Sequence, residues 1–192
     1  MLSRPEAELG LVCGIDEAGR GPLAGPVCAA AVILPEDWLP EGLDDSKKLS
    51  AKKRDALYDE IIEHALSWSI GWASHAEIDE VNILQATFLA MRRALEGLQM
   101  KPDFALVDGN RDPKLGIPTR CEVKGDGRYA CIAAASILAK VSRDRLLDEL
   151  DEKYPGYGLK KHKGYPTKAH YAALGELGPS EIHRLSFLKK KK

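Results

Sequence analysis

The sequence from residue 11 to residue 34 reads LVCGIDEAGRGPLAGPVCAAAVIL and sets the architecture of the chain. Two apolar runs, residues 11–15 and 27–34, stand on either side of the turn signal Gly19-Arg20-Gly21-Pro22. Short apolar runs bounded by glycine and proline are typical of buried strands. We therefore predict two neighbouring β-strands.

Helical and strand-like patterns follow one another along the rest of the chain. Ser50 is a typical helix-start residue before a helical spacing of apolar residues. The patterns predict helices over residues 52–64, 83–99 and 130–150, a half-buried strand through Trp68, Ile70 and Trp72, a buried strand over 104–107, and an extended stretch over 117–123. This order indicates an α/β or α+β fold with a mixed sheet.

Length and composition restrict the class of protein. The 192 residues suit one compact domain, 1–192, and the 44% apolar and 30% charged content is that of a globular protein. No apolar run approaches the roughly 20 residues that span a bilayer, and residues 1–9 lack the apolar stretch of a secretory signal. We expect no membrane role and a cytoplasmic location.

The four cysteines lie in apolar or strand-like segments without CxxC spacing: Cys13, Cys28, Cys121 and Cys131. Reduced thiols in such segments behave as small hydrophobic groups, so we expect buried free cysteines. A thiolate metal site or a disulfide is the alternative.

Basic charge is concentrated near the C-terminus, although the formal net charge is only −1. Residues 154–170 contain lysines and histidines, no acidic residue, and tyrosines interleaved with them. Such a pattern suits phosphate contacts with stacking on sugars or bases, and it equally suits a solvated loop. We interpret residues 154–192 as a substrate-contacting segment that ends in a solvated basic tail, residues 189–192.

Acidic residues follow the predicted strands. Asp16 and Glu17 come at the end of the first strand, Asp108 ends another, and Asp126 precedes the long helix. If the two strands are neighbours, Asp16 and Asp108 lie about 5 Å apart, close enough to share a hard cation such as Mg²⁺ or Mn²⁺. Taken singly, Asp108 and Asp126 are better explained as turn or helix-cap residues. Clustered carboxylates repel one another unless cations neutralise them, which favours a metal site.

The segment from Gly19 to Gly25 follows a strand but is not a dinucleotide fingerprint. Its glycine spacing differs from G-x-G-x-x-G, and a strand is predicted after it instead of a helix. Its glycines expose backbone N–H groups and allow a sugar or phosphate to approach, with Arg20 adding positive charge. A plain tight turn explains them as well.

A family resemblance rests on this opening and on blocks along nearly the whole chain. The stretch GIDEAGRGPLAGPV, residues 14–27, resembles the signature of ribonuclease HII. Later blocks of the same family appear in order: DSKKL at 45–49, VDG at 107–109, KGD at 124–126, IAAASI at 132–137, AKV at 139–141, RD at 143–144, GYPT at 164–167 and HRLSF at 183–187.

The resemblance implies a ribonuclease H-like α/β fold, with a central mixed sheet flanked by helices and a helical C-terminal region. It implies that Asp16, Glu17, Asp108 and Asp126 are the catalytic, metal-binding carboxylates. Residues matched to substrate contacts fall in three groups. The turn that senses a 2′-hydroxyl is Gly19, Arg20 and Gly21; the tyrosine that packs on the next sugar is Tyr165; and the expected phosphate contacts are Lys47, Lys48, Ser136, Lys140 and Arg143. For Lys48 and Arg143 an ordinary place on a helix surface is the alternative.

The resemblance also implies the reaction: a two-metal hydrolysis, with Mg²⁺ or Mn²⁺, on the 5′ side of ribonucleotides in RNA/DNA hybrids or duplex DNA, leaving 3′-hydroxyl and 5′-phosphate ends. Another ribonuclease H-fold nuclease, such as a junction resolvase, and a non-catalytic hybrid-binding module are the alternatives. We expect a monomer. A replication clamp or polymerase is a conceivable partner, although the sequence shows no clear clamp-binding peptide. His162 is expected to contact phosphate or solvent, and His183 to cap or pack.

Overall fold

The computed structural model of the chain describes residues 2–189. Its sheet contains, in this range, β1 (Val12–Ala18), β2 (Val27–Ile33), β3 (Ser67–Ala73), β4 (Phe104–Asp108) and β5 (Thr119–Glu122). Their order is β3-β2-β1-β4-β5. The β1–β2 and β2–β3 pairs are antiparallel, whereas β1–β4 and β4–β5 are parallel, which confirms the predicted mixed sheet. Of the predicted basic tail, residues 190–192 lie outside the described residues.

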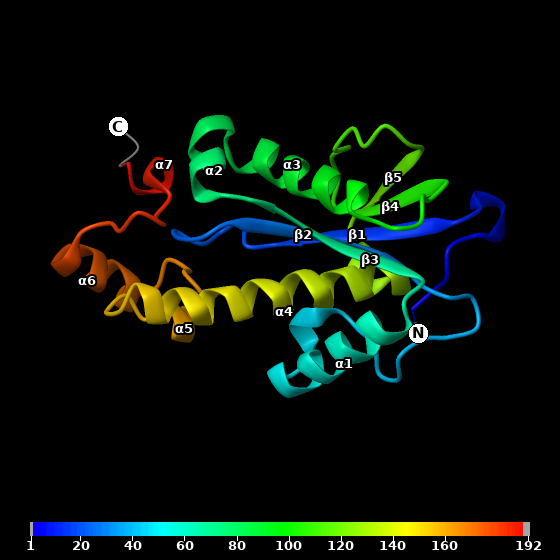
Figure 1. The fold of residues 1–192 in the computed structure, drawn as a ribbon, viewed down its shortest axis with the longest axis horizontal. Helices are drawn as coiled ribbons and strands as arrows, with labels where there is room; N and C mark the ends of the chain where they lie inside the picture. Colours follow the sequence, from blue (N-terminus) through cyan, green and yellow to red (C-terminus); the bar gives the residue numbers. More distant parts are fainter. Residues whose placement is uncertain (1, 190–192) are drawn as a thin grey trace.

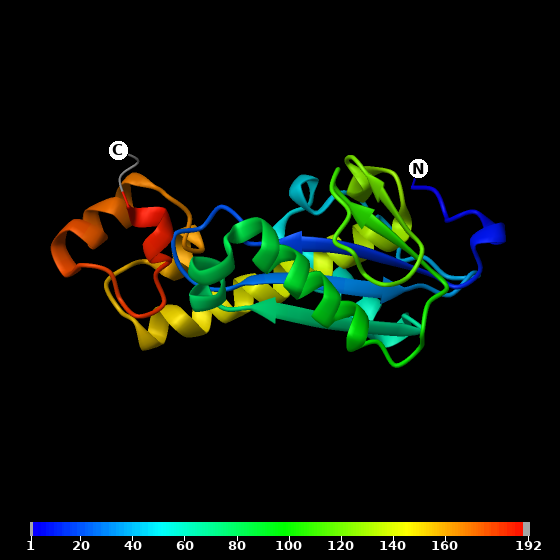
Figure 2. The same cartoon turned by 90° about the horizontal axis from the view of Figure 1, so that it is seen from above.

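Helices cover both faces of this sheet (Figure 1). One face packs against α3 (Ile83–Glu96), preceded by the short α2 (His75–Val81); the other packs against α4 (Ala130–Lys153), which is itself covered by α1 (Ala51–His64). Three short C-terminal helices, α5 (Leu159–His162), α6 (Lys168–Leu177) and α7 (Leu185–Leu188), gather at one end of the sheet (Figure 2). Three 3-10 turns complete the described elements: η1 (Ala7–Leu9), η2 (Ser46–Lys48) and η3 (Gly125–Gly127).

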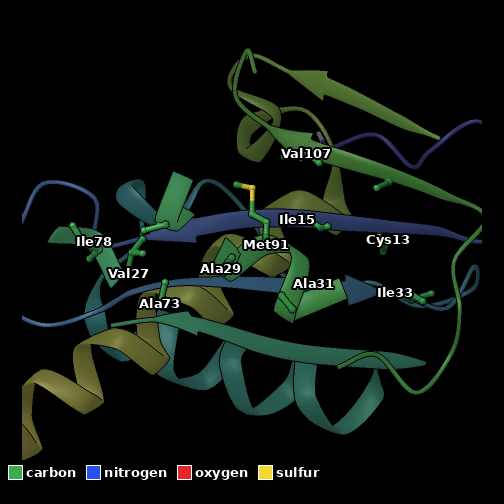
Figure 3. Close-up of a cluster of buried hydrophobic side chains, with 14 residues drawn as sticks. Cys13, Ile15, Val27, Ala29, Ala31, Ile33, Ala73, Ile78, Met91 and Val107 are labelled. Carbon is green, nitrogen blue, oxygen red and sulfur yellow. The ribbon is translucent and has the colours of Figure 1, made fainter. Parts of the chain in front are cut away.

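The core lies in two layers because β2 is buried on both faces along its whole length. Val27, Ala29, Ala31 and Ile33 pack toward α3 (Figure 3), and the alternate residues of β2 pack toward α4. Small side chains let the helices approach closely. At Gly14 an added Cβ would lie only 2.2 Å from the Cys131 carbonyl carbon. The backbone of α4 is therefore held directly against β1.

Most predicted elements form, with shifted ends. The first helix begins after Ser50, whose hydroxyl accepts a hydrogen bond from the Lys53 N–H, as its start signal predicted. The strand predicted over residues 11–15 runs on to Ala18, so Asp16 and Glu17 lie inside β1 instead of after it. Helix α2 was not predicted; a capping box between Ser74 and Glu77 starts it.

The four cysteines are free, as predicted. Cys13, Cys28 and Cys131 are buried, and burial raises the pKa of each of these thiols to about 12. Cys121 is only partly buried, which corrects the expectation for that residue. Within residues 2–189 no helix combines the length and apolar character needed to cross a membrane.

Candidate active site

A cleft of about 260 Å³ opens at the carboxyl ends of β1 and β4. Its walls come from β1, the following glycine-rich turn, η2, α4 and the C-terminal region. The predicted site residues that line it are Asp16, Glu17, Gly19, Arg20, Gly21, Lys47, Asp108, Ser136, Lys140, Arg143 and Tyr165. Residues separated by well over a hundred positions thus meet in one place.

The carboxylates are brought together by the parallel pairing of β1 and β4. Ile15 pairs with Val107, so Asp16 and Asp108 are the next residues along two neighbouring strands, which meets the condition that the sequence analysis set for a shared cation. Asp16 is 5% exposed, and its Oδ1 accepts a hydrogen bond from the Glu17 N–H at 2.7 Å. Asp108 Oδ1 accepts one from the Gly125 N–H at 2.7 Å, which places the η3 turn, and with it Asp126, beside β4.

Burial and mutual repulsion govern the electrostatics of this group. Burial, followed by the negative charges of Glu17 and Asp108, raises the pKa of Asp16 well above its usual range. Burial also raises the pKa of Glu17 and, together with Asp126, that of Asp108. Each neighbour therefore makes ionisation of the next one harder.

The donor set suits a hard divalent cation, because carboxylate oxygens are the ligands such ions prefer. Among the described residues no group of three or more acidic, histidine or cysteine side chains is already closed around a common point. One reason lies at Asp126, which is 4% exposed. Its Oδ2 accepts a hydrogen bond from Lys47 Nζ at 3.0 Å. Arg20 approaches Glu17 in the same way, Nη1 to Oε1 at 3.4 Å. Cationic side chains thus neutralise part of the acidic group.

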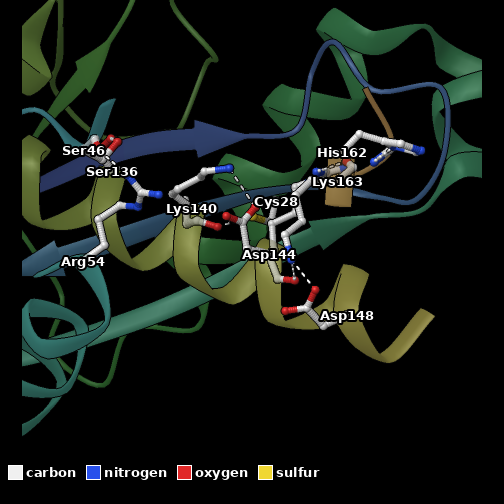
Figure 4. A network of polar contacts seen from close by, with 12 residues as sticks. Cys28, Ser46, Arg54, Ser136, Lys140, Asp144, Asp148, His162 and Lys163 are labelled. Carbon is white, nitrogen blue, oxygen red and sulfur yellow. Dashed lines mark hydrogen bonds and ion pairs between the residues drawn. The ribbon is translucent and has the colours of Figure 1, made fainter. Parts of the chain in front are cut away.

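Polar side chains of α4 and η2 also line the cleft (Figure 4). The hydroxyl groups of Ser46 and Ser136 are hydrogen-bonded at 2.9 Å. Lys140 Nζ lies 2.7 Å from Asp144 Oδ1, one helical turn further along α4. Ser136 and Lys140 are four residues apart in α4, so they lie on one face of the helix, toward the cleft.

Tyr165 and the glycine-rich turn form the far rim. An added Cβ on Gly21 would lie 3.4 Å from Tyr165 Cε1, so the ring rests against the backbone of the turn. The Tyr165 side chain remains 42% exposed beside it. Of the tyrosines interleaved with lysines, Tyr157 is buried and donates its hydroxyl to the Gly178 carbonyl, so it is not free to stack on a ligand.

Three residues do not reach the open cleft as expected substrate contacts. Lys48 is exposed, pairs with Asp44 and does not line the cleft, which fits the surface alternative. Arg143 touches the cleft but is 1% exposed, and it donates to the carbonyls of Pro26, Lys163 and Ala24, so its guanidinium is already engaged by backbone. His162 is not directed at solvent, because its Nε2 donates to the Tyr157 carbonyl and its ring stacks on His170.

Two arginines that the sequence analysis did not single out support the site. Arg54 donates to the carbonyls of Ser46 and Leu49 and so holds the η2 turn in place. Arg184 is completely buried, and burial together with the nearby Arg143 lowers its pKa to about 9. Only its presence in the block at residues 183–187 marked Arg184 in advance, and that block carried no assigned role.

Known proteins resemble this chain along most of its length. The ribonuclease HII family profile matches residues 13–190. Ribonuclease HII of Dechloromonas aromatica (strain RCB) is 62% identical over 179 residues, covering 93% of this chain and 91% of that protein. The crystal structure of ribonuclease H2 from Pyrococcus horikoshii OT3 superposes with a TM-score of 0.76 at 30% identity, covering 91% and 92% of the two chains.

A second solved structure, the PCNA:RNase HII complex from Archaeoglobus fulgidus, matches with a TM-score of 0.75 at 30% identity and covers 95% of this chain and 97% of that one. These likenesses confirm the ribonuclease H-like fold that the resemblance implied. The chain therefore belongs to the ribonuclease HII family and is an endoribonuclease of the ribonuclease H type.

Proposed function

We propose that this protein hydrolyses the phosphodiester bond on the 5′ side of ribonucleotides, both in RNA/DNA hybrids and at single ribonucleotides in duplex DNA. The products carry 3′-hydroxyl and 5′-phosphate ends. One observation carries the proposal: a single cleft is lined by the carboxylates of Asp16, Glu17 and Asp108 and also by a glycine-rich turn with an exposed tyrosine. The first suits phosphodiester chemistry, and the second suits recognition of a ribose.

Asp16, Glu17, Asp108 and Asp126 are the residues that would hold two Mg²⁺ or Mn²⁺ ions. Such ions supply Lewis-acid activation of an attacking water and charge stabilisation at the departing oxygen. The raised pKa values of Asp16, Glu17 and Asp108 support this role, since added positive charge relieves the repulsion that raises them. Lys47 and Arg20 compensate part of the same charge in the free protein.

The other cleft residues bind and orient the substrate. The backbone of Gly19, Arg20 and Gly21 faces the 2′-hydroxyl of the ribonucleotide, which distinguishes RNA from DNA at one position. Tyr165 packs on the neighbouring sugar. Lys47, Ser136 and Lys140 contact phosphates, which position the duplex without reading its sequence. Arg143 keeps its place beneath the turn instead of reaching a phosphate.

Cleavage of a labelled DNA duplex with one internal ribonucleotide tests the proposal. With Mg²⁺ or Mn²⁺ we expect one cut on the 5′ side of the ribonucleotide and none in the same duplex made entirely of DNA. Asp16→Asn should abolish the cut, and Asp37→Asn, at an exposed position away from the cleft, should retain it. Binding without any cut would favour a hybrid-binding module, and equal cutting of four-way junctions would favour a resolvase.

We also propose that the protein acts as a monomer, and we include a sliding clamp among its candidate partners. Support for the clamp comes from the Archaeoglobus fulgidus ribonuclease HII, which was solved in a complex with PCNA. Size-exclusion chromatography with light scattering, on the purified chain alone and mixed with the clamp of its own organism, tests both proposals. The mass of a dimer would contradict the monomer, and elution of chain and clamp in separate peaks at high concentration would contradict the clamp as a partner.

A further inference from the structure

Arg184 lies beneath the Gly19–Gly21 turn and is 0% exposed. Its three side-chain nitrogen atoms each donate to a carbonyl of the segment between β1 and β2: Nη2 to Gly19 at 2.7 Å, Nη1 to Arg20 at 3.0 Å and Nε to Gly25 at 2.9 Å. The ring of Phe187 lies 5.2 Å from its guanidinium carbon. Within residues 2–189 the guanidinium has no carboxylate partner, so its hydrogen bonds serve to hold the conformation of the turn.

These bonds determine where the N–H groups of the turn point. A trans peptide directs its N–H away from its C=O. Because the carbonyls of Gly19 and Arg20 face Arg184, the N–H groups of Arg20 and Gly21 face the opposite side, where both residues line the cleft. Neither N–H has a hydrogen-bond partner among the described residues. The turn thus presents two free donors beside Tyr165.

Backbone contacts from the same C-terminal region lock this arrangement. The Arg184 N–H donates to the Leu23 carbonyl at 2.8 Å, and the Gly25 N–H donates to the Ile182 carbonyl at 2.9 Å. Arg143 supports the turn from α4, since an added Cβ on Gly19 would lie 2.0 Å from its Nε. Gly19 has a φ of 94°, a conformation that glycine adopts without strain.

We infer that Arg184 is a positioning residue for ribonucleotide recognition: it fixes the turn so that the N–H groups of Arg20 and Gly21 meet the 2′-hydroxyl. This inference rests on the proposed function. A site built to hydrogen-bond a hydroxyl rejects the analogue that lacks it, but only while its donors are held in place. Lysine keeps the charge of Arg184, yet a single ammonium cannot reach three carbonyls in the fixed geometry of the guanidinium.

The test compares two affinities of the full-length protein, measured by fluorescence anisotropy in EDTA, where no cleavage takes place. One duplex carries a single ribonucleotide, and the other has the same sequence in DNA only. For Arg184→Lys we expect the ratio of the two affinities to fall roughly tenfold, the scale of one to two lost hydrogen bonds, while the affinity for the all-DNA duplex stays within about twofold. The kcat/KM for the ribonucleotide duplex, with Mg²⁺, should fall by the same factor.

Ile33→Ala is the matched control for lost stability, since Ile33 is buried at the opposite end of the sheet, where it pairs with Ser67. This variant should melt at a lower temperature and keep the wild-type ratio. A wild-type ratio in folded Arg184→Lys overturns the inference and leaves the proposed function standing. A wild-type protein that binds both duplexes equally overturns both.

Arg184→Ala provides a second test if the lysine variant does not fold at the assay temperature. Added ethylguanidinium should restore its preference for the ribonucleotide duplex, because the guanidinium group can re-enter the space left by the side chain. Ethylammonium, with the same charge, should not. Equal restoration by the two compounds, or restoration by neither in a folded protein, contradicts the positioning role.

Discussion

His170 and His183 share a hydrogen bond between their Nε2 atoms, which lie 3.0 Å apart in the interior of the C-terminal region. The Nδ1 of His170 faces the Tyr165 carbonyl at 3.0 Å and must donate to it, so its Nε2 accepts from His183. The Nδ1 of His183 in turn accepts from the Ser180 N–H at 3.0 Å. Both rings are therefore neutral, and the chain of hydrogen bonds ends at the backbone of Tyr165.

This pair predicts a loss of stability in mild acid. Burial, and next the neighbouring His170, lowers the pKa of His183 to about 4, against about 6.5 in an unfolded chain. Below pH 6.5 His183 binds a proton in the unfolded state but not in the native state, so the free energy of unfolding falls as the pH drops toward 4. The His183 contribution should reach about 2 kcal/mol at pH 5. Urea unfolding at pH 7.5 and pH 5 measures it.

His183→Gln should remove most of this difference between the two pH values, and His64→Gln, at an exposed position, should leave it unchanged. The pH dependence of the free energy of unfolding is compared between wild type and variant, because this difference isolates the histidine. The buried carboxylates with raised pKa change the stability in the opposite direction as the pH falls, and they contribute equally to both proteins. An identical pH dependence in wild type and His183→Gln would show that this pair is not responsible.

Asp16→Asn should lose activity and gain stability. A metal ligand is expected to matter more than the outer-shell partners of a metal site, whose loss costs roughly 10- to 100-fold, so we expect a fall in kcat of more than about 100-fold.

Without divalent ions the same change removes a buried charge next to Glu17 and Asp108. We therefore expect the free energy of unfolding to rise by about 1 kcal/mol, or the Tm by about 2–4 °C. Calorimetry in EDTA, then with Mg²⁺, should show the gain disappear as the ion stabilises only the wild type. A lower Tm for the variant in EDTA would contradict the repulsion.

Lys47 and Lys48 should differ in their contribution to duplex binding. Lys47 lines the cleft beside Asp126, whereas Lys48 is paired with Asp44 outside it. Lys47→Gln should lower the slope of log affinity against log salt concentration by about 1, as expected for one lost phosphate contact. Lys48→Gln is the matched control and should leave the slope unchanged. Equal effects of the two variants would place the duplex elsewhere.

Tyr165 should act through its ring. Tyr165→Ala should reduce kcat/KM for the ribonucleotide duplex by roughly 10- to 100-fold, the scale of one lost stacking contact, and Tyr165→Phe should cost much less. Tyr171→Ala removes a 53% exposed ring outside the cleft and serves as the control. Steady-state kinetics with one substrate ranks the variants. A phenylalanine variant as poor as the alanine variant would show that the hydroxyl, not the ring, makes the contact.

Much of the fold follows from local patterns in the sequence. The apolar run around Ile15, the start signal at Ser50 and the long Ala-rich stretch ending near Lys153 predicted their elements, because backbone hydrogen bonding and side-chain periodicity depend on nearby residues. The position of Asp108 at the end of its strand was also predicted, whereas Asp16 lies inside β1. The sequence did not predict that the two strands are parallel neighbours, since strand order depends on how helices pack over the sheet.

The sequence by itself determined the chemistry that is available: acidic groups near the carboxyl ends of strands, a glycine-rich turn, and lysines interleaved with tyrosines. Only the tertiary structure decided which of two like residues serves the site. Lys47 and Lys48 carry the same charge one position apart, but η2, held by Arg54, directs Lys47 to Asp126, a residue 79 positions away. Arg143 and Arg184 are buried because carbonyls of the segment between β1 and β2 converge on them. Such choices depend on contacts between distant segments, and these exist only when the chain is folded.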